Sequence, residues 1–149
     1  MSDNNDLIRS LLARIDELES RSAIRDLVSD YCLGFDNHDW PRFVAIWHPD
    51  AVWEIGPPFG TFHGHAGIHQ AVHEVLYPFW RESHHLATNL RIEFSDADHA
   101  RSVCNVDCMG ASVENVVQMV GATYSDDFER RNGVWNISKR KVTIHYFNP

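Results

Sequence analysis

The chain is poor in cysteine and contains neither a long apolar run nor a block of basic residues. Its three cysteines, Cys32, Cys104 and Cys108, are an odd number whose spacing fits no disulfide or zinc framework. No apolar run approaches the roughly 18 residues that a membrane span needs. The opening MSDNNDLIRS lacks the apolar core of a signal peptide. These absences predict a reduced, cytoplasmic protein without a membrane anchor.

Positive charge is also scarce. The chain carries 13 Lys and Arg against 21 Asp and Glu, a formal net charge of −8 at pH 7. Nucleic acids and anionic membrane surfaces attract basic proteins, so we expect neither as a partner. No glycine-rich phosphate loop is present, and no cofactor is expected. The 149 residues, 44% of them hydrophobic, suit one domain with one core.

The first half of the sequence has helical periodicity. Apolar residues between Ile8 and Leu18 predict one helix, and Ser20 or Ser22 is a candidate cap for a second that carries Tyr31. Shorter elements are expected after them: a helix over 40–47, a strand over 51–55, a turn over 56–60 and a helix over 67–80.

After Ser83 the apolar period changes to two. This pattern predicts four long strands, over about 84–94, 100–111, 114–128 and 134–147, and Asn132-Gly133 is a hairpin signal. Helices followed by an antiparallel meander indicate an α+β fold. We expect one domain over 1–149, with 1–20 as an N-terminal helical extension and a cavity between the curved sheet and the helices.

Four of the ten histidines fall in HGHAGIHQAVHE, residues 63–74. On a helix, His65, His69 and His73 would form one row beside the apolar stripe, while Glu74 would point away from it. The pattern matches neither zinc-protease signature. We interpret the row as surface or interface histidines at the edge of the buried face; a weak zinc or nickel site is the alternative.

Three longer segments carry a family resemblance. They are RSAIRDLVSDYCLGFDNHDWPRFVAIWHPDAVWEIG (21–56), HHLATNLRIEF (84–94) and DDFERRNGVWNISKRKVTIHYF (126–147). Together they resemble the SnoaL-like branch of the NTF2-like superfamily, in particular the γ-hexachlorocyclohexane dehydrochlorinases and, more distantly, scytalone dehydratase. The resemblance implies an NTF2-like (cystatin-like) cone: N-terminal helices packed on a strongly curved antiparallel sheet that encloses a pocket. It also implies a homotrimer, with a dimer as the alternative.

The resemblance assigns three catalytic positions: a dyad of His85 and Asp36, completed by Arg140. Neutral imidazole accepts a proton near neutral pH, and a carboxylate on its other nitrogen fixes the tautomer and stabilises the imidazolium. Arg140 could face developing negative charge. The residues alone leave alternatives open: Asp36 as a helix cap, His84 instead of His85 as the inward histidine, and Arg140 in a structural ion pair with Asp36.

The pocket-lining residues are also placed by the resemblance. One position departs from it, because Tyr31 stands where the family has a lysine; a tyrosine can donate a hydrogen bond but brings no charge, which favours a hydroxyl or water leaving group over a halide. The other expected wall residues, for which plain core is the alternative, are Trp53, Val106, Cys108 and Val142. Strand alternation places Arg140, Val142, Ile144 and Tyr146 on one face.

These features together predict a cofactor-independent lyase of the dehydratase or dehydrohalogenase type, which carries out a β-elimination on a small, largely apolar cyclic molecule with a His-Asp dyad. An isomerase or cyclase that uses the same dyad is one alternative. A non-catalytic protein is the other: a small-ligand-binding module or a subunit like the small subunit of ring-hydroxylating dioxygenases.

Overall fold

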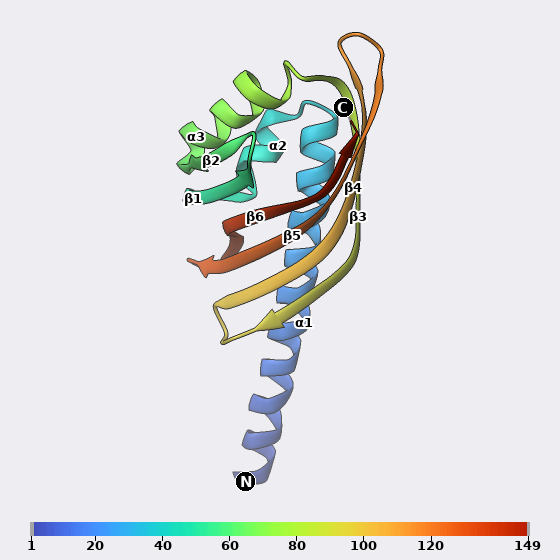
Figure 1. Cartoon of the computed structure of the whole chain (residues 1–149). Helices are drawn as coiled ribbons and strands as arrows, with labels where there is room; N and C mark the ends of the chain where they lie inside the picture. The colour runs from blue at the N-terminus through green and yellow to red at the C-terminus, as the bar shows by residue number, and fades with distance from the viewer. Residues whose placement is uncertain (1, 149) are drawn as a thin grey trace.

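One long helix and one curved sheet make up most of the fold (Figure 1). The computed structural model describes residues 2–148, with side chains from Asn4 onward. Its helices are α1 (Ser2–Asp36), α2 (Trp40–Ala45) and α3 (Gly64–Gln70), and a π-helical segment, η1 (Ala71–Leu76), continues α3. Its strands are β1 (Trp47–Gly56), β2 (Gly60–His63), β3 (Trp80–Phe94), β4 (His99–Ser112), β5 (Val117–Arg131) and β6 (Val134–Asn148).

Helix α1 is continuous, so the predicted cap at Ser20 or Ser22 is wrong. The Ser20 hydroxyl is buried and accepts a hydrogen bond from the indole Nε1 of Trp135, at 3.0 Å, instead of capping a helix start. After Ser20, buried residues recur every three or four positions along the helix, at Ile24, Val28, Tyr31 and Phe35. This side packs on the sheet and brings the C-terminal end of α1 to the pocket.

The sheet has six strands in the order β2-β1-β6-β5-β4-β3. The four long predicted strands are confirmed, and their ends differ by a few residues at most. The pairing differs at one place, because β1 runs parallel to β6 while every other pair is antiparallel. The short strand β2 was not predicted. The expected helix over 67–80 begins earlier, at Gly64, and ends at Leu76, because Trp80 already opens β3.

The helices cover one face of the curved sheet, and the core lies between them (Figure 1). Aromatic rings dominate this core: Tyr31, Phe35, Phe43, Trp47, Trp53 and Tyr124 are buried and in mutual contact. The predicted α+β, NTF2-like architecture is therefore confirmed. Within residues 2–148, no helix is both long and apolar enough to span a membrane.

Candidate active site

An apolar pocket lies between α1 and the sheet. Seven of its lining residues are aromatic: Tyr31, Phe35, Trp53, Phe59, Trp80, Tyr124 and Phe147. Seven are aliphatic: Ile55, Leu76, Val106, Val120, Ala122, Val142 and Ile144. His85 and Cys108 complete the lining. Such a surface favours an apolar ligand, and the few polar groups on it determine how that ligand is oriented.

The His85 imidazole enters this pocket from β3 and is held by Asp36, the last residue of α1. Its Nδ1 lies 2.6 Å from Asp36 Oδ1, and its backbone N–H donates to Asp36 Oδ2 at 2.8 Å. Ser83, two residues earlier on β3, donates its hydroxyl to Asp36 Oδ1 at 2.8 Å. Because Nδ1 faces a carboxylate that can only accept, the ring proton belongs on Nδ1 and Nε2 is left as the free base.

Packing fixes the orientation of the imidazole. The rings of Tyr31 and Phe35 meet it edge-on, with centroids at 5.8 and 5.2 Å. Strand alternation separates the two adjacent histidines as expected: His84 is exposed, whereas His85 is buried. Asp36 also ends a helix whose last turn has no basic residue, so the negative end of the helix dipole adds to its charge.

Asp36 is an ionised acceptor in this setting. Burial by itself raises the pKa of its carboxyl group, but the hydrogen bonds from His85 and Ser83 outweigh burial and bring the pKa below its ordinary value. Among the described residues, Asp36 makes no hydrogen bond to the backbone at the start of a helix, so its contacts do not indicate a cap.

Arg140 takes a different place from the one expected. Its partner is Asp126 and not Asp36: Nε and Nη2 donate to the two carboxylate oxygens at 2.8 and 2.7 Å. The two residues face each other across β5 and β6, and both side chains are fully buried. Burial opposes the charge on the guanidinium, but the adjacent Asp126 carboxylate raises the pKa of Arg140 further above its ordinary value. The pair is therefore ionic and neutral as a unit.

Two tyrosines separate Arg140 from the pocket. The guanidinium carbon lies 4.1 Å from the ring centroid of Tyr31 and 4.3 Å from that of Tyr124, whose hydroxyl donates to that of Tyr31 at 3.3 Å. Arg140 does not line the pocket, although its Nη1 has no hydrogen-bond partner among the described residues. Burial raises the pKa of both phenols, so both stay protonated as hydrogen-bond donors.

All five expected wall residues line the pocket: Tyr31, Trp53, Val106, Cys108 and Val142. Burial raises the pKa of the Cys108 thiol to about 12, which suits an inert wall residue and not a nucleophile. That these five wall residues contact a substrate stays a prediction.

One orientation on β6 was predicted wrongly. Tyr146 is 51% exposed and donates its hydroxyl to Asp107 on the outer face, while its neighbour Phe147 lines the pocket. The pairing of β5 with β6 shifts register between Gly121 and Ala122, which face Tyr146 and Ile144. A bulge of this kind exchanges the two faces of a strand, so simple alternation fails beyond Ile144.

The histidine row lies apart from this pocket, on α3 and η1. His65 Nε2 is hydrogen-bonded to the carbonyl of Trp47, and the rings of His69 and His73 pack against Trp40. His65 and His73 are half-buried and His69 is exposed, so the row does lie at the edge of the buried face. Within the described residues, no group of three or more potential ligands is arranged to hold a metal.

Sequence reasoning missed three residues of the site. Ser83 and Tyr124 carry no sequence signal that sets them apart. Asp126 carries such a signal, because it alternates with Tyr124 and Phe128 on the buried face of β5. A carboxylate at an inward position between two aromatic residues needs a buried partner, and that partner is Arg140.

A helix-covered curved sheet around an apolar pocket with one inward histidine defines an NTF2-like protein. A model of the SnoaL-like domain family matches residues 16–141, and the chain belongs to this family. Hexachlorocyclohexane dehydrochlorinase 1 of Sphingobium indicum is 40% identical over 139 residues, which are 93% of this chain and 90% of that enzyme. The γ-hexachlorocyclohexane dehydrochlorinase of the same species is 39% identical and covered to 88%.

Solved structures agree with this placement. The crystal structure of a type 2 hexachlorocyclohexane dehydrochlorinase superposes with a TM-score of 0.87 at 40% identity, over 91% of this chain and 92% of that one. A putative scytalone dehydratase from Novosphingobium aromaticivorans superposes with a TM-score of 0.81 at 19% identity, over 91% and 90%, and shares the fold. The dehydrochlorinases among these relatives are lyases that eliminate HCl, so the prediction that this chain is a lyase-type enzyme is confirmed.

Proposed function

We propose that this chain is a cofactor-independent lyase that carries out a β-elimination on a small, largely apolar cyclic molecule. The observation that carries the proposal is the 2.6 Å contact between His85 Nδ1 and Asp36 Oδ1 at the wall of an aromatic pocket. It presents one imidazole nitrogen, Nε2, to the space where an apolar ring would bind. The dehydrochlorinase relatives act on a molecule of this kind, a chlorinated cyclohexane.

The proposed reaction needs only groups that this chain supplies. His85 Nε2 takes a proton from one ring carbon, the electrons of that C–H bond form a C=C bond, and the leaving group departs from the next carbon with its electron pair. Asp36 holds the Nδ1 proton and stabilises the imidazolium that forms. The apolar wall excludes water, which strengthens the electrostatic effect of these charges.

The charge of the pocket bears on the leaving group. Arg140 is neutralised by Asp126 and lies behind two tyrosine rings, and Tyr31, where the family resemblance implies a lysine, brings no charge. The group that could assist departure is therefore a neutral donor, the phenol of Tyr31, whose hydroxyl accepts a hydrogen bond from Tyr124. This arrangement favours a hydroxyl leaving group, which takes from the His85 imidazolium the proton abstracted from carbon and departs as water, over one that departs as free chloride.

The same observation supports a second candidate, an isomerase or cyclase with the same dyad. Proton transfer between two carbons of one molecule releases no anion, so it needs no cation in the pocket. The two candidates differ in their products, because an isomerase leaves the mass of the substrate unchanged while an elimination lowers it.

We expect replacement of His85 to abolish turnover without loss of the fold. The probes are hexachlorocyclohexane, followed by chloride release, and a panel of hydroxylated cyclic ketones, followed by mass spectrometry. His85→Ala should lower kcat by about 10²–10⁴-fold, the usual contribution of a general base. His84→Ala, the exposed neighbour on the same strand, is the matched control and should leave kcat unchanged. Full activity in His85→Ala would eliminate the mechanism.

A non-catalytic role is a further outcome of this test. A protein that binds ring compounds in the pocket but converts none of the probes would fit a ligand-binding module or a dioxygenase small subunit instead.

We also propose a homotrimer in the cytoplasm, with a dimer as the alternative assembly; light scattering on the purified protein measures its mass directly.

A further inference from the structure

The N-terminal half of α1 projects beyond the sheet (Figure 1). This part of the helix carries an apolar stripe. The stripe consists of six residues that are between 45% and 67% exposed: Leu7, Ile8, Leu11, Leu12, Ile15 and Leu18. An apolar surface of this density on a helix is normally buried against another element. Most of it precedes residue 16, where the match to the family begins.

The sheet of the same chain cannot cover this stripe. Ser20 marks the side of α1 that faces the sheet, since its hydroxyl bonds the buried Trp135. Leu11 precedes Ser20 by nine positions, about two and a half helical turns, so it lies on the opposite side. The helix cannot roll to bring Leu11 inward, because contacts on its sheet-facing side fix its orientation.

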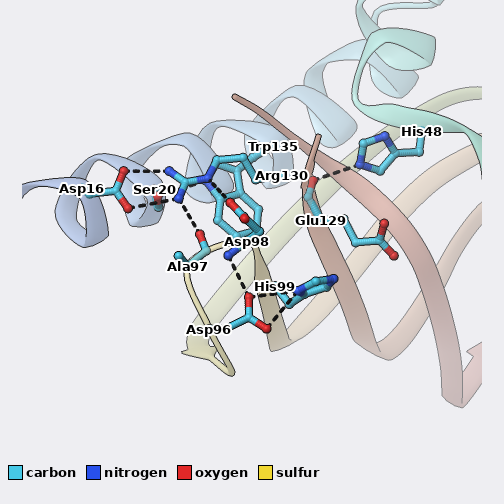
Figure 2. A network of polar contacts seen from close by, with 10 residues as sticks. All are labelled: Asp16, Ser20, His48, Asp96, Ala97, Asp98, His99, Glu129, Arg130 and Trp135. Carbon is cyan, nitrogen blue, oxygen red and sulfur yellow. Dashed lines mark hydrogen bonds and ion pairs between the residues drawn. The ribbon is translucent and has the colours of Figure 1, made fainter. Parts of the chain in front are cut away.

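Those contacts form a polar network around Arg130 (Figure 2). Arg130 donates to both carboxylate oxygens of Asp16 at 2.7 and 3.2 Å and also binds Asp98 and the carbonyl of Ala97. Arg21, one turn beyond Asp16, donates to the carbonyl of Ile92 at 2.9 Å. The helix is therefore held at residues 16–21, and the stripe points away from the domain.

The spacing of the stripe is a heptad repeat. Ile8 and Ile15 occupy one core position, a, and Leu11 and Leu18 occupy the other, d. In parallel coiled coils, a β-branched residue at a with Leu at d favours two strands. The next a position is the polar Ser22, so the repeat ends where α1 meets its own sheet.

Charges beside the repeat specify a parallel arrangement. Arg14 occupies position g and Glu19 the following position e, and these two positions face each other between parallel helices. Within residues 2–148, neither side chain forms an ion pair that would compete. Leu7 and Leu12 occupy the preceding g and e positions, so they would meet across the pair in the same way.

We propose that residues 4–21 pair with the same segment of a second copy of this chain in a parallel, two-stranded coiled coil. An isolated helix of this length is only marginally stable in water, and an apolar stripe that its own domain does not cover requires a partner from outside the chain. A second copy supplies an identical stripe and the complementary charge at once. The coil joins two domains, or two assemblies of domains, through their projecting helices.

Light scattering of the full chain after size exclusion tests the pairing. Leu11→Lys with Leu18→Lys should lower the mass of the wild-type particle to that of the assembly that the domains form by themselves. Both side chains are exposed and lie outside the core of the domain, so the near-UV circular dichroism of the buried tryptophans should be unchanged. Ser10→Lys adds one such charge outside the stripe and is the control. An unchanged mass in the double variant would overturn the proposal.

A charge exchange tests the parallel register. Arg14→Glu or Glu19→Arg alone should place like charges together and raise the dissociation constant of the paired form, while the two changes together should restore it. Equal effects of single and double variants would overturn the register. An independent check is Leu11→Cys, whose mild oxidation should give a covalent dimer, because equal d positions meet only in a parallel, in-register pair; Ser10→Cys should give none.

Discussion

Each of two carboxylates behind the pocket wall holds one basic side chain, and the two pairs leave different atoms free. Asp36 binds His85 through Nδ1, which leaves Nε2 outside this pair, and His85 lines the pocket. Asp126 binds Arg140 through two nitrogens, and the remaining one lies behind tyrosine rings. One pair thus suits proton transfer, whereas the other fixes the packing of the two phenols.

The Arg140–Asp126 pair should be costly to break and cheaper to remove. Asp126→Leu leaves a fully buried guanidinium without its partner, and we expect a loss of about 3–5 kcal/mol in the free energy of unfolding. Arg140→Met added to it removes the unpaired charge and should recover most of that loss. Urea unfolding of both variants measures the difference. A double variant as unstable as Asp126→Leu would show that the pair itself, and not the unpaired charge, determines the effect.

At the scale of elements, α1 connects the sheet to the pocket and to the projecting stripe. The sequence pattern predicted its two parts but also a break between them, because serine before a polar, charged segment is a common helix cap. Ser20 instead has a partner 115 residues away, Trp135, and such a pairing leaves no local signal. Helix continuity therefore depended on a tertiary contact that periodicity does not reveal.

This contact should contribute measurably to stability. Ser20→Ala removes the acceptor of the buried Trp135 indole N–H, and an unsatisfied buried donor costs about 1–3 kcal/mol. Ser22→Ala, an exposed site on the same helix, is the matched control and should change stability by less than about 0.5 kcal/mol. The two values come from denaturant unfolding. Equal losses of stability in the two variants would show that the Ser20–Trp135 hydrogen bond does not hold α1 on the sheet.

The strands show the same limit of local pattern. Period-two alternation located the four long strands and placed His84 and His85 on opposite faces, but the choice of His85 as the inward histidine came from the family resemblance. It failed at Tyr146 and Phe147, because the bulge opposite Gly121 and Ala122 depends on how β5 and β6 pair. It also gave no hint that β1 runs parallel to β6, since strand direction follows from how the chain connects the elements and not from residue period.

At the scale of the whole molecule, the pocket combines side chains from α1 and from all the long strands. The expected wall residues line it, and His85 and Asp36 meet, as the family resemblance implied. Residue patterns alone could not reach this, because His85 and Asp36 lie 49 positions apart. Arg140 was expected at the pocket, yet it lies behind Tyr31 and Tyr124, since only tertiary structure brings Asp126 to it.

Filling the pocket should block binding of apolar rings. Val142→Phe places a larger side chain at a half-buried wall position, and we expect a cyclohexane-type ligand to raise the Tm of the wild type but not of this variant. Val134→Phe, 60% exposed on the same strand, is the control and should keep the ligand effect. Thermal unfolding with and without ligand gives the result. Stabilisation of Val142→Phe equal to that of the wild type would place the binding site elsewhere.

The most direct test of the central claim is the tautomer of His85, measured by NMR of the imidazole nitrogens at about pH 8, where an ordinary histidine is neutral. We predict that the proton resides on Nδ1, hydrogen-bonded to Asp36, and that Nε2 has the shift of an unprotonated base. Asp36→Asn should shift the proton toward Nε2, because the amide can donate to Nδ1. A proton on Nε2 in the wild type, unchanged in Asp36→Asn, would contradict His85 as the base and Asp36 as the residue that orients it.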